Sequence, residues 1–181
     1  MTIEWKTIVW QQFGAAIDMF GATLDACPEQ LWQATLWEAR DEPPEYAQFW
    51  YLTYHTLFWL DLYLSGTAEG FTPPAPFTLA ELDPAGLLPE RPYTRDNLRA
   101  YLAHCRRKCQ RLLTDLTDET ATRRCRFSWG EVAFAELQLY NMRHVQEHAA
   151  QLGLFLGQRT GWPAGWVARA RPAPGGVTQD G

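Results

Sequence analysis

One segment of the chain, residues 44–64, is apolar nearly all round when it is drawn as a helix. Pro43-Pro44 suits the start of a helix, and Ser65-Gly66 suits its end. Large side chains occupy two opposite faces: Tyr51, Leu52, His55, Phe58, Trp59 and Leu62 on one, and Trp50, Tyr54, Leu57 and Leu64 on the other. A helix with two apolar faces is buried on both sides. We therefore expect the rest of the domain to cover one face and a partner subunit to cover the other.

Three further segments have the apolar periodicity of helices, and no strand pattern competes with them. In residues 5–26, apolar positions recur three and four residues apart. Residues 94–116 carry a similar apolar stripe. The fourth helix is predicted to begin near Ser128 and to run to Gly157, because Ser128 and Glu131 have the spacing of a capping box. The sequence therefore predicts an all-α protein built as a four-helix bundle.

A Pro-rich connection of 27 residues, 66–92, separates the second and third helices. So long a segment without its own periodicity needs a reason, usually function or a crossing between distant helix ends. Residues 161–181 form a Pro/Gly-rich C-terminal tail, in which Trp162 and Trp166 are candidates for docking. The last ten or so residues are expected to be disordered. We therefore predict one domain over residues 1–160, followed by this partly disordered tail.

Charge and composition exclude several classes of protein. The formal net charge of −5 and the lack of a basic stripe argue against nucleic-acid binding. No run of ~18 uncharged apolar residues is present, so no membrane span is expected. The N-terminus lacks the order of a signal peptide, and four cysteines in 181 residues do not suggest a disulfide framework. We therefore expect a cytoplasmic protein with reduced thiols.

Three of the four histidines have the arrangement of a metal site. His144 and His148 are four residues apart, which places them on one helical face, about 6 Å apart at Cβ. His55, on the apolar helix, supplies a third imidazole if the two helices face each other. Three protein ligands and an open position are typical of a catalytic metal site. The competing interpretations are a hydrogen-bonded core histidine at position 55 and a solvent-facing pair, but burying three neutral imidazoles without a shared partner is costly.

The residues around the histidine pair are candidates for further roles. His144-Val-Gln-Glu147-His148 has the residue order of inverzincins, in which the glutamate is a general base. Inverzincins are larger and contain sheets, so Glu147 is only a candidate base, and the alternative is a glutamate that is solvated or that supports a ligand. Asn141 and Gln151, which flank the pair by three residues, are candidates for ligand support or pocket lining, with a structural role as the alternative.

The order of motifs along the chain resembles a known family. The histidine of the aromatic-rich second helix is followed by the Pro-rich connection, then by Tyr93-Thr-Arg-Asp-Asn-Leu98, and late in the chain by Leu139-Tyr-Asn-Met-Arg-His-Val-Gln-Glu-His-Ala-Ala-Gln-Leu152. Over roughly residues 5–160 this resembles the DinB-like (DinB/YfiT) family. The resemblance implies a four-helix bundle in up-down-down-up order, a divalent metal held by His55, His144 and His148, and a homodimer. Family members of known activity include S-transferases and isomerases that use low-molecular-weight thiols.

Two hypotheses about function follow. In the first, the protein is a metal-dependent enzyme acting on a small molecule. A metal with an open position lowers the pKa of a bound water, which gives hydrolysis, or that of a thiol cosubstrate, which gives S-transfer or isomerisation. Imidazole suits zinc, nickel and iron, and zinc is slightly favoured. In the second, the protein is a non-catalytic metal-binding or stress-related interaction module, a reading that a fourth protein ligand closing the site would favour.

Overall fold

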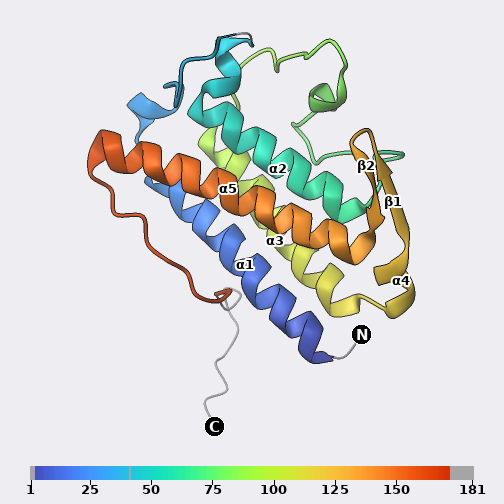
Figure 1. Ribbon diagram of the computed structural model, residues 1–181. Helices are drawn as coiled ribbons and strands as arrows, with labels where there is room; N and C mark the ends of the chain where they lie inside the picture. The colour runs from blue at the N-terminus through green and yellow to red at the C-terminus, as the bar shows by residue number, and fades with distance from the viewer. Residues whose placement is uncertain (1–2, 41, 172–181) are drawn as a thin grey trace.

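The computed structural model describes residues 3–40 and 42–171 and is mostly helical (Figure 1). The long helices are α1 (Ile3–Ala26), α2 (Phe49–Ser65), α3 (Arg95–Asp115) and α5 (Phe134–Thr160). A short helix, α4 (Asp118–Thr122), precedes a two-stranded antiparallel sheet of β1 (Arg124–Phe127) and β2 (Gly130–Ala133). Short 3-10 helices lie at Glu29–Leu31, Pro44–Ala47 and Ala80–Leu82.

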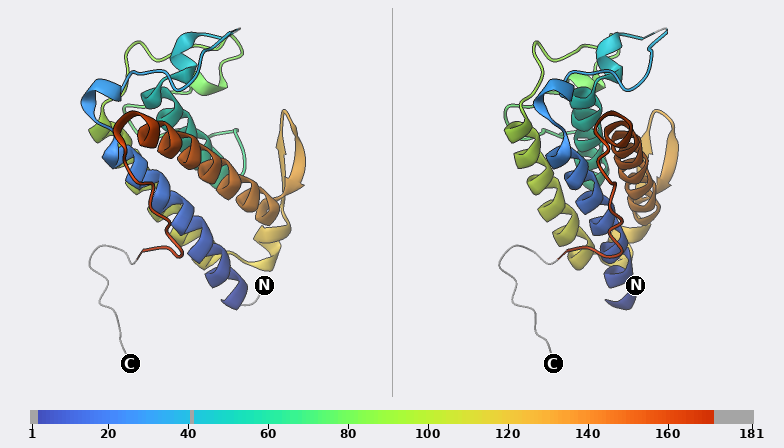
Figure 2. Two further views of the ribbon diagram at one scale, coloured as in Figure 1. Left: turned by 60° about the vertical axis from the view of Figure 1, so that its left-hand side comes forward. Right: turned by 90° about the vertical axis from the view of Figure 1, so that its left-hand side faces the viewer.

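The four long helices lie side by side around a shared apolar core (Figure 2). Helix α1 packs against α3 and α5, and α2 packs against the same two helices. In Figure 1, α1 and α5 run from right to left, whereas α2 and α3 run from left to right. Phe13, Phe20 and Phe58 are fully buried in this core. Burial of each such side chain stabilises the fold by ~1.5–3 kcal/mol. The apolar contacts between the helices therefore stabilise their association.

Helix α2 is buried on both faces within a single chain, since 14 of its 17 residues are buried. Besides α3 and α5, the Pro-rich connection between α2 and α3 covers it. Phe71 packs on Phe58 and Phe77 packs on Tyr54, with ring centroids 5.5 and 5.9 Å apart. The second apolar face therefore needs no partner subunit to cover it. A homodimer stays a prediction from the resemblance alone.

The predicted start of the fourth helix is wrong, and the protein is not purely α-helical. Residues 124–133 form the β1–β2 hairpin, and α5 begins at Phe134 rather than near Ser128. Ser128 and Trp129 form the two-residue loop between the strands. The Ser-x-x-Glu spacing of a capping box therefore lies in a hairpin here. Contacts with the rest of the protein stabilise the hairpin at Ser128 instead of the start of a helix.

The hairpin is held by a charge cluster and by aromatic stacking. Glu131 accepts hydrogen bonds from Arg124 at 2.9 Å and from Arg126 at 2.7 Å, which favours the strand pairing instead of capping a helix. The ring of Trp129 stacks on Tyr140 of α5 at a centroid distance of 4.7 Å. The hairpin thus packs against the first turns of α5.

Residues at the ends of α2 and at the start of α3 explain where these helices begin and end. A 3-10 turn occupies Pro44–Ala47, so α2 begins at Phe49, later than predicted. It ends as predicted before Gly66, whose φ of 75° is a conformation that favours glycine. At the start of α3, the Thr94 hydroxyl accepts from the Asn97 backbone N–H at 3.2 Å, and the Asn97 side chain accepts from the Thr94 N–H at 3.3 Å. This reciprocal cap fixes the end of the long connection.

The chain after α5 turns back along α1 (Figure 1). The backbone N–H of Ala170 donates to a carbonyl oxygen of α1 at 2.9 Å. A Cβ at Gly14 would lie 2.5 Å from that of Ala170, so this close approach requires glycine. Trp162 packs against the core, whereas Trp166 is 77% exposed. The disorder predicted for the last ten or so residues concerns 172–181, which lie outside the described residues.

All four cysteines are free and buried: Cys27, Cys105, Cys109 and Cys125. Burial raises the pKa of each thiol, that of Cys27 to about 12. We expect Ellman's reagent to leave the native protein unlabelled at neutral pH and to label four thiols after unfolding, because both burial and the lack of thiolate slow the reaction. The absorbance of the released thiolate counts the labelled sites, and rapid labelling of the native protein would contradict this prediction.

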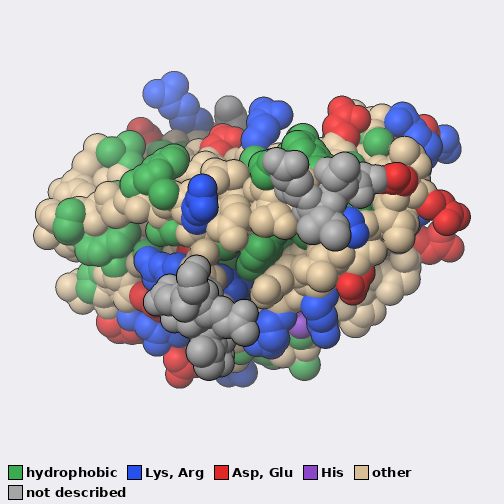
Figure 3. Space-filling view, turned by 90° about the horizontal axis from the view of Figure 1, so that it is seen from below, with side chains coloured by type: hydrophobic (Ala, Val, Ile, Leu, Met, Phe, Trp, Pro, Cys, Tyr) green, Lys and Arg blue, Asp and Glu red, His purple; other side chains and the backbone are tan. Residues whose placement is uncertain are grey.

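None of the helices in residues 3–40 and 42–171 combines the length and the apolar character that a membrane span needs. Acidic and basic side chains are interspersed over the face seen in Figure 3.

Candidate metal centre

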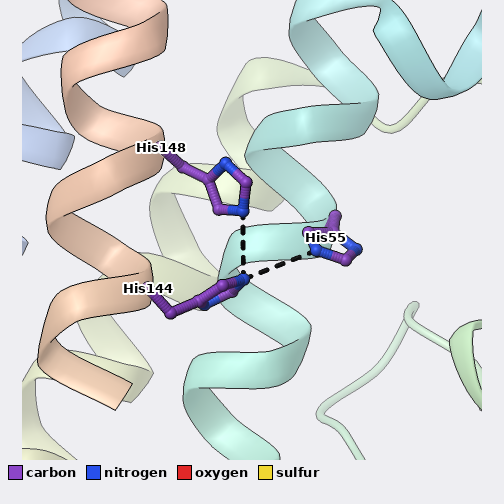
Figure 4. Close-up of side chains that lie close together, drawn as sticks. All are labelled: His55, His144 and His148. Carbon is purple, nitrogen blue, oxygen red and sulfur yellow. Dashed lines mark hydrogen bonds between the residues drawn. The ribbon is translucent and has the colours of Figure 1, made fainter. Parts of the chain in front are cut away.

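Three histidines from two facing helices converge on one point (Figure 4). His55 comes from α2, and His144 and His148 come from successive turns of α5. The Nε2 atom of His144 lies 3.4 Å from Nε2 of His55 and 3.1 Å from Nε2 of His148. Ligand atoms of all three lie within 4.8 Å of one another, and the group contains no fourth His, Cys, Asp or Glu from the described residues.

The spacing of these nitrogens fits a bound cation. Metal–imidazole bonds of ~2.0–2.1 Å in a tetrahedral arrangement place neighbouring nitrogens about 3.3 Å apart. Without a metal, a proton on Nε2 of His144 lets this ring hydrogen-bond to the lone pairs of its two neighbours. With the proton of each ring on Nδ1, all three Nε2 lone pairs are available to one cation. The donor set therefore suits one divalent metal, with at least one coordination position left to another ligand.

Hydrogen bonds to the outer ring nitrogens assign two of the tautomers. Nδ1 of His55 donates to Glu81 Oε2 at 2.8 Å, and Nδ1 of His148 donates to Gln151 Oε1 at 2.7 Å. A proton on Nδ1 leaves Nε2 of the neutral ring as a lone pair, which is the form that binds a metal. Nδ1 of His144 is buried and has no partner among the described residues.

The surroundings keep the two histidines of α5 uncharged. Burial, followed by the charges of His148 and His55, lowers the pKa of His144 to about 2. Burial also lowers the pKa of His148, although the hydrogen bond to Gln151 and the charge of Glu147 act in the opposite direction. Neutral imidazoles are competent ligands, so this pair needs no deprotonation before it binds a metal.

Glu81 is the residue of this site that the sequence analysis missed. It lies in the short 3-10 helix of the connection, and its side chain is 5% exposed. Its carboxylate accepts hydrogen bonds from His55, from Trp59 Nε1 at 2.8 Å and from the Tyr51 hydroxyl. Burial by itself raises the pKa of Glu81, but the hydrogen bond and charge of His55 and the hydrogen bonds of Tyr51 and Trp59 outweigh it and lower the pKa. No spacing in the sequence relates Glu81 to the histidines, because a loop joins them.

A cavity of about 470 Å³ opens beside the histidines. His55, His148, Gln151 and Glu81 form its polar side, and its other lining residues are Trp37, Glu42, Tyr46, Tyr51, Leu52 and Trp59. Polar atoms of three aromatic side chains in this lining already donate hydrogen bonds within the protein. Trp59 and Tyr51 donate to Glu81, and the Tyr46 hydroxyl donates to Gly86 O at 2.9 Å. The aromatic rings therefore offer mainly apolar surface and π faces to a ligand.

The structure gives different surroundings to the three candidates near the histidine pair, Asn141, Glu147 and Gln151. Gln151 lines the cavity and holds His148. Asn141 is buried and donates from Nδ2 to Leu60 O of α2 at 3.1 Å, so it ties the two ligand-bearing helices together. Glu147 is exposed and is not among the described residues that line the cavity.

Comparison with known proteins places the chain in a family. A family model described as the DinB superfamily matches residues 12–152, a stretch that contains all three histidines. Searches of curated proteins and of solved structures gave no match. Since the match spans well over half of the 181 residues, the chain belongs to the DinB superfamily.

Proposed function

We propose that His55, His144 and His148 bind one divalent cation, with zinc favoured, and that the protein uses it in a reaction on a small molecule. The observation that carries the proposal is the convergence of three Nε2 atoms beside a cavity large enough for a small substrate. A divalent cation held by three neutral imidazoles supplies Lewis acidity at its open position, which suits activation of a water or of a low-molecular-weight thiol.

The chain's own residues contribute binding and orientation. Glu81 and Gln151 hold the rings of His55 and His148. Asn141 fixes the distance between α2 and α5. The lining of the cavity contains no Lys or Arg among the described residues, so an anionic group of a substrate finds no basic partner there. An uncharged or cationic compound with an aromatic or apolar part fits this lining best.

A role in catalysis, rather than a closed structural metal, is supported by the ligand count. Three protein ligands leave a position open, whereas structural zinc sites are closed by four. Since burial raises the pKa of every cysteine thiol, a thiol that takes part in the reaction has to come from a cosubstrate. The exposed position of Glu147 gives no support to its role as a base.

We infer that residues 1–160 form one four-helix domain in up-down-down-up order and that the Pro-rich connection is the crossover between its two parallel neighbours, α2 and α3. The helix directions in Figure 1 and the packing of α1 and α2 against the same two helices support this order. We expect the protein to be a homodimer and to be located in the cytoplasm. Light scattering after size exclusion measures the mass of the assembly and so checks the dimer.

Metal analysis of untagged protein purified without chelator tests the proposal directly. We expect about one divalent metal per chain, removable by a chelator and restored by adding zinc. A screen of the zinc-loaded protein with several thiols and electrophiles then separates S-transfer from hydrolysis. A wild-type protein that binds no divalent metal would contradict the proposal. Metal binding without any turnover would favour a non-catalytic metal-binding module.

A further inference from the structure

The connection between α2 and α3 reaches the histidines through one side chain. Residues 78–93 are all exposed or half-buried, and the 3-10 helix Ala80–Leu82 contains no buried residue. Within this stretch only Glu81 contacts a histidine of the cluster by a hydrogen bond among the described residues, and its carboxylate is nearly enclosed. Hydrogen bonds from Tyr46 to Gly86 O and from Trp32 Nε1 to Tyr93 O also hold this stretch, and Leu82, Leu88 and Tyr93 pack against the core.

We propose that Glu81 is a positioning residue that couples metal binding at the histidines to the ordering of the crossover around it. The inference rests on the proposed metal site. Ordering of residues 78–93 places a carboxylate on His55, and a cation on His55 holds that carboxylate, and with it residues 78–93, in place.

The first half of the coupling acts on the tautomer of His55. A carboxylate only accepts hydrogen bonds, so Glu81 Oε2 at 2.8 Å requires the proton on Nδ1. That proton position leaves Nε2, the atom that faces His144, free to bind a cation. Tyr51 and Trp59 donate to the same carboxylate and fix its direction. When the crossover moves away, His55 loses this constraint on both its tautomer and its ring orientation.

The second half acts on the crossover. A cation at Nε2 withdraws electron density from the ring and makes the Nδ1–H a stronger donor to an ionised carboxylate. Residues 78–93 are all exposed or half-buried, and their packing on the core is limited to partly buried side chains such as Leu82, Leu88 and Tyr93, so the hydrogen bonds to Glu81 contribute substantially to resisting local opening. A stronger bond to Glu81 therefore reduces that opening. Coupling of this kind is reciprocal, so the factor by which ordering raises metal affinity equals the factor by which metal favours ordering.

Zinc titration and hydrogen exchange on the full-length protein test the coupling together. Glu81→Gln and Glu81→Ala are compared with wild type and with Glu90→Gln, a matched loss of charge at an exposed position of the same connection. Zinc affinity is measured by competition with a chromophoric chelator, and amide exchange of residues 78–93 is followed with and without zinc. We expect zinc to slow this exchange in wild type and in Glu90→Gln. In Glu81→Ala, zinc affinity falls by about 10–100-fold and the zinc-dependent protection disappears.

Glu81→Gln distinguishes positioning from a merely structural role. Its amide oxygen still accepts from Nδ1 of His55, so we expect it to recover part of the affinity that Glu81→Ala loses, while far-UV circular dichroism without zinc stays the same in both variants. Zinc binding by wild type with equal affinity in Glu81→Ala, or with no change in exchange of residues 78–93, overturns the coupling and leaves the metal site standing. If wild type itself binds no zinc, the proposed function fails and the coupling fails with it.

Discussion

Replacing His144 with alanine is expected to abolish tight zinc binding, with a loss of affinity of more than about 100-fold. His144 is the central imidazole of the cluster, because its Nε2 is 3.4 Å from that of His55 and 3.1 Å from that of His148. Loss of a residue that only supports a ligand costs about 10–100-fold, so loss of the ligand itself costs more. Competition of the protein with a chromophoric chelator measures the change. His55→Ala is expected to act in the same direction.

The fourth histidine provides the matched control for this prediction. His104 lies on α3, its side chain is 38% exposed, and it is outside the cluster of three. We expect His104→Ala to bind zinc with wild-type affinity. Equal zinc affinity in His144→Ala and His104→Ala would show that the three converging imidazoles do not form the metal site.

The second large effect is expected at an ion pair between α2 and α3. Asp61 is 1% exposed, and its Oδ1 lies 2.6 Å from Lys108 Nζ. The same ammonium donates to the Asp61 backbone oxygen at 3.0 Å and to Ser65 Oγ at 2.7 Å, while the Tyr101 hydroxyl donates to Asp61 Oδ2 at 3.1 Å. Lys108→Met leaves a buried carboxylate without its cation. We expect the free energy of unfolding to fall by about 3–5 kcal/mol, measured by urea denaturation at neutral pH.

Two variants show whether burial causes this effect. Arg99 and Asp25 form an exposed pair at 2.7 Å, so Arg99→Gln should cost only about 0.2–1 kcal/mol. The double variant Asp61→Asn with Lys108→Met removes the buried carboxylate together with its half-buried cation and should recover part of the stability that Lys108→Met loses. A loss of less than about 1 kcal/mol in Lys108→Met would mean that water reaches Asp61 and screens its charge.

The helices and the ligand candidates were predictable because both depend on short-range periodicity. Apolar residues at helical spacing located all four long helices, and the four-residue separation of His144 and His148 placed both on one face of α5. The error at Ser128 has a physical cause. The same Ser-x-x-Glu spacing serves a helix cap or a hairpin, and the choice falls to contacts such as Glu131 with Arg126 and Trp129 with Tyr140.

The sequence by itself determined the chemistry of the candidate site, namely three imidazoles on two helices, since residue type and helical phase need no knowledge of the fold. Only the tertiary structure decided what surrounds them. It placed Glu81 against His55, formed the aromatic cavity, and packed Phe71 and Phe77 of the chain's own connection on the two apolar faces of α2, at Phe58 and Tyr54. These contacts join residues whose separation along the chain follows no period, so packing of the whole chain fixes them and no local pattern predicts them.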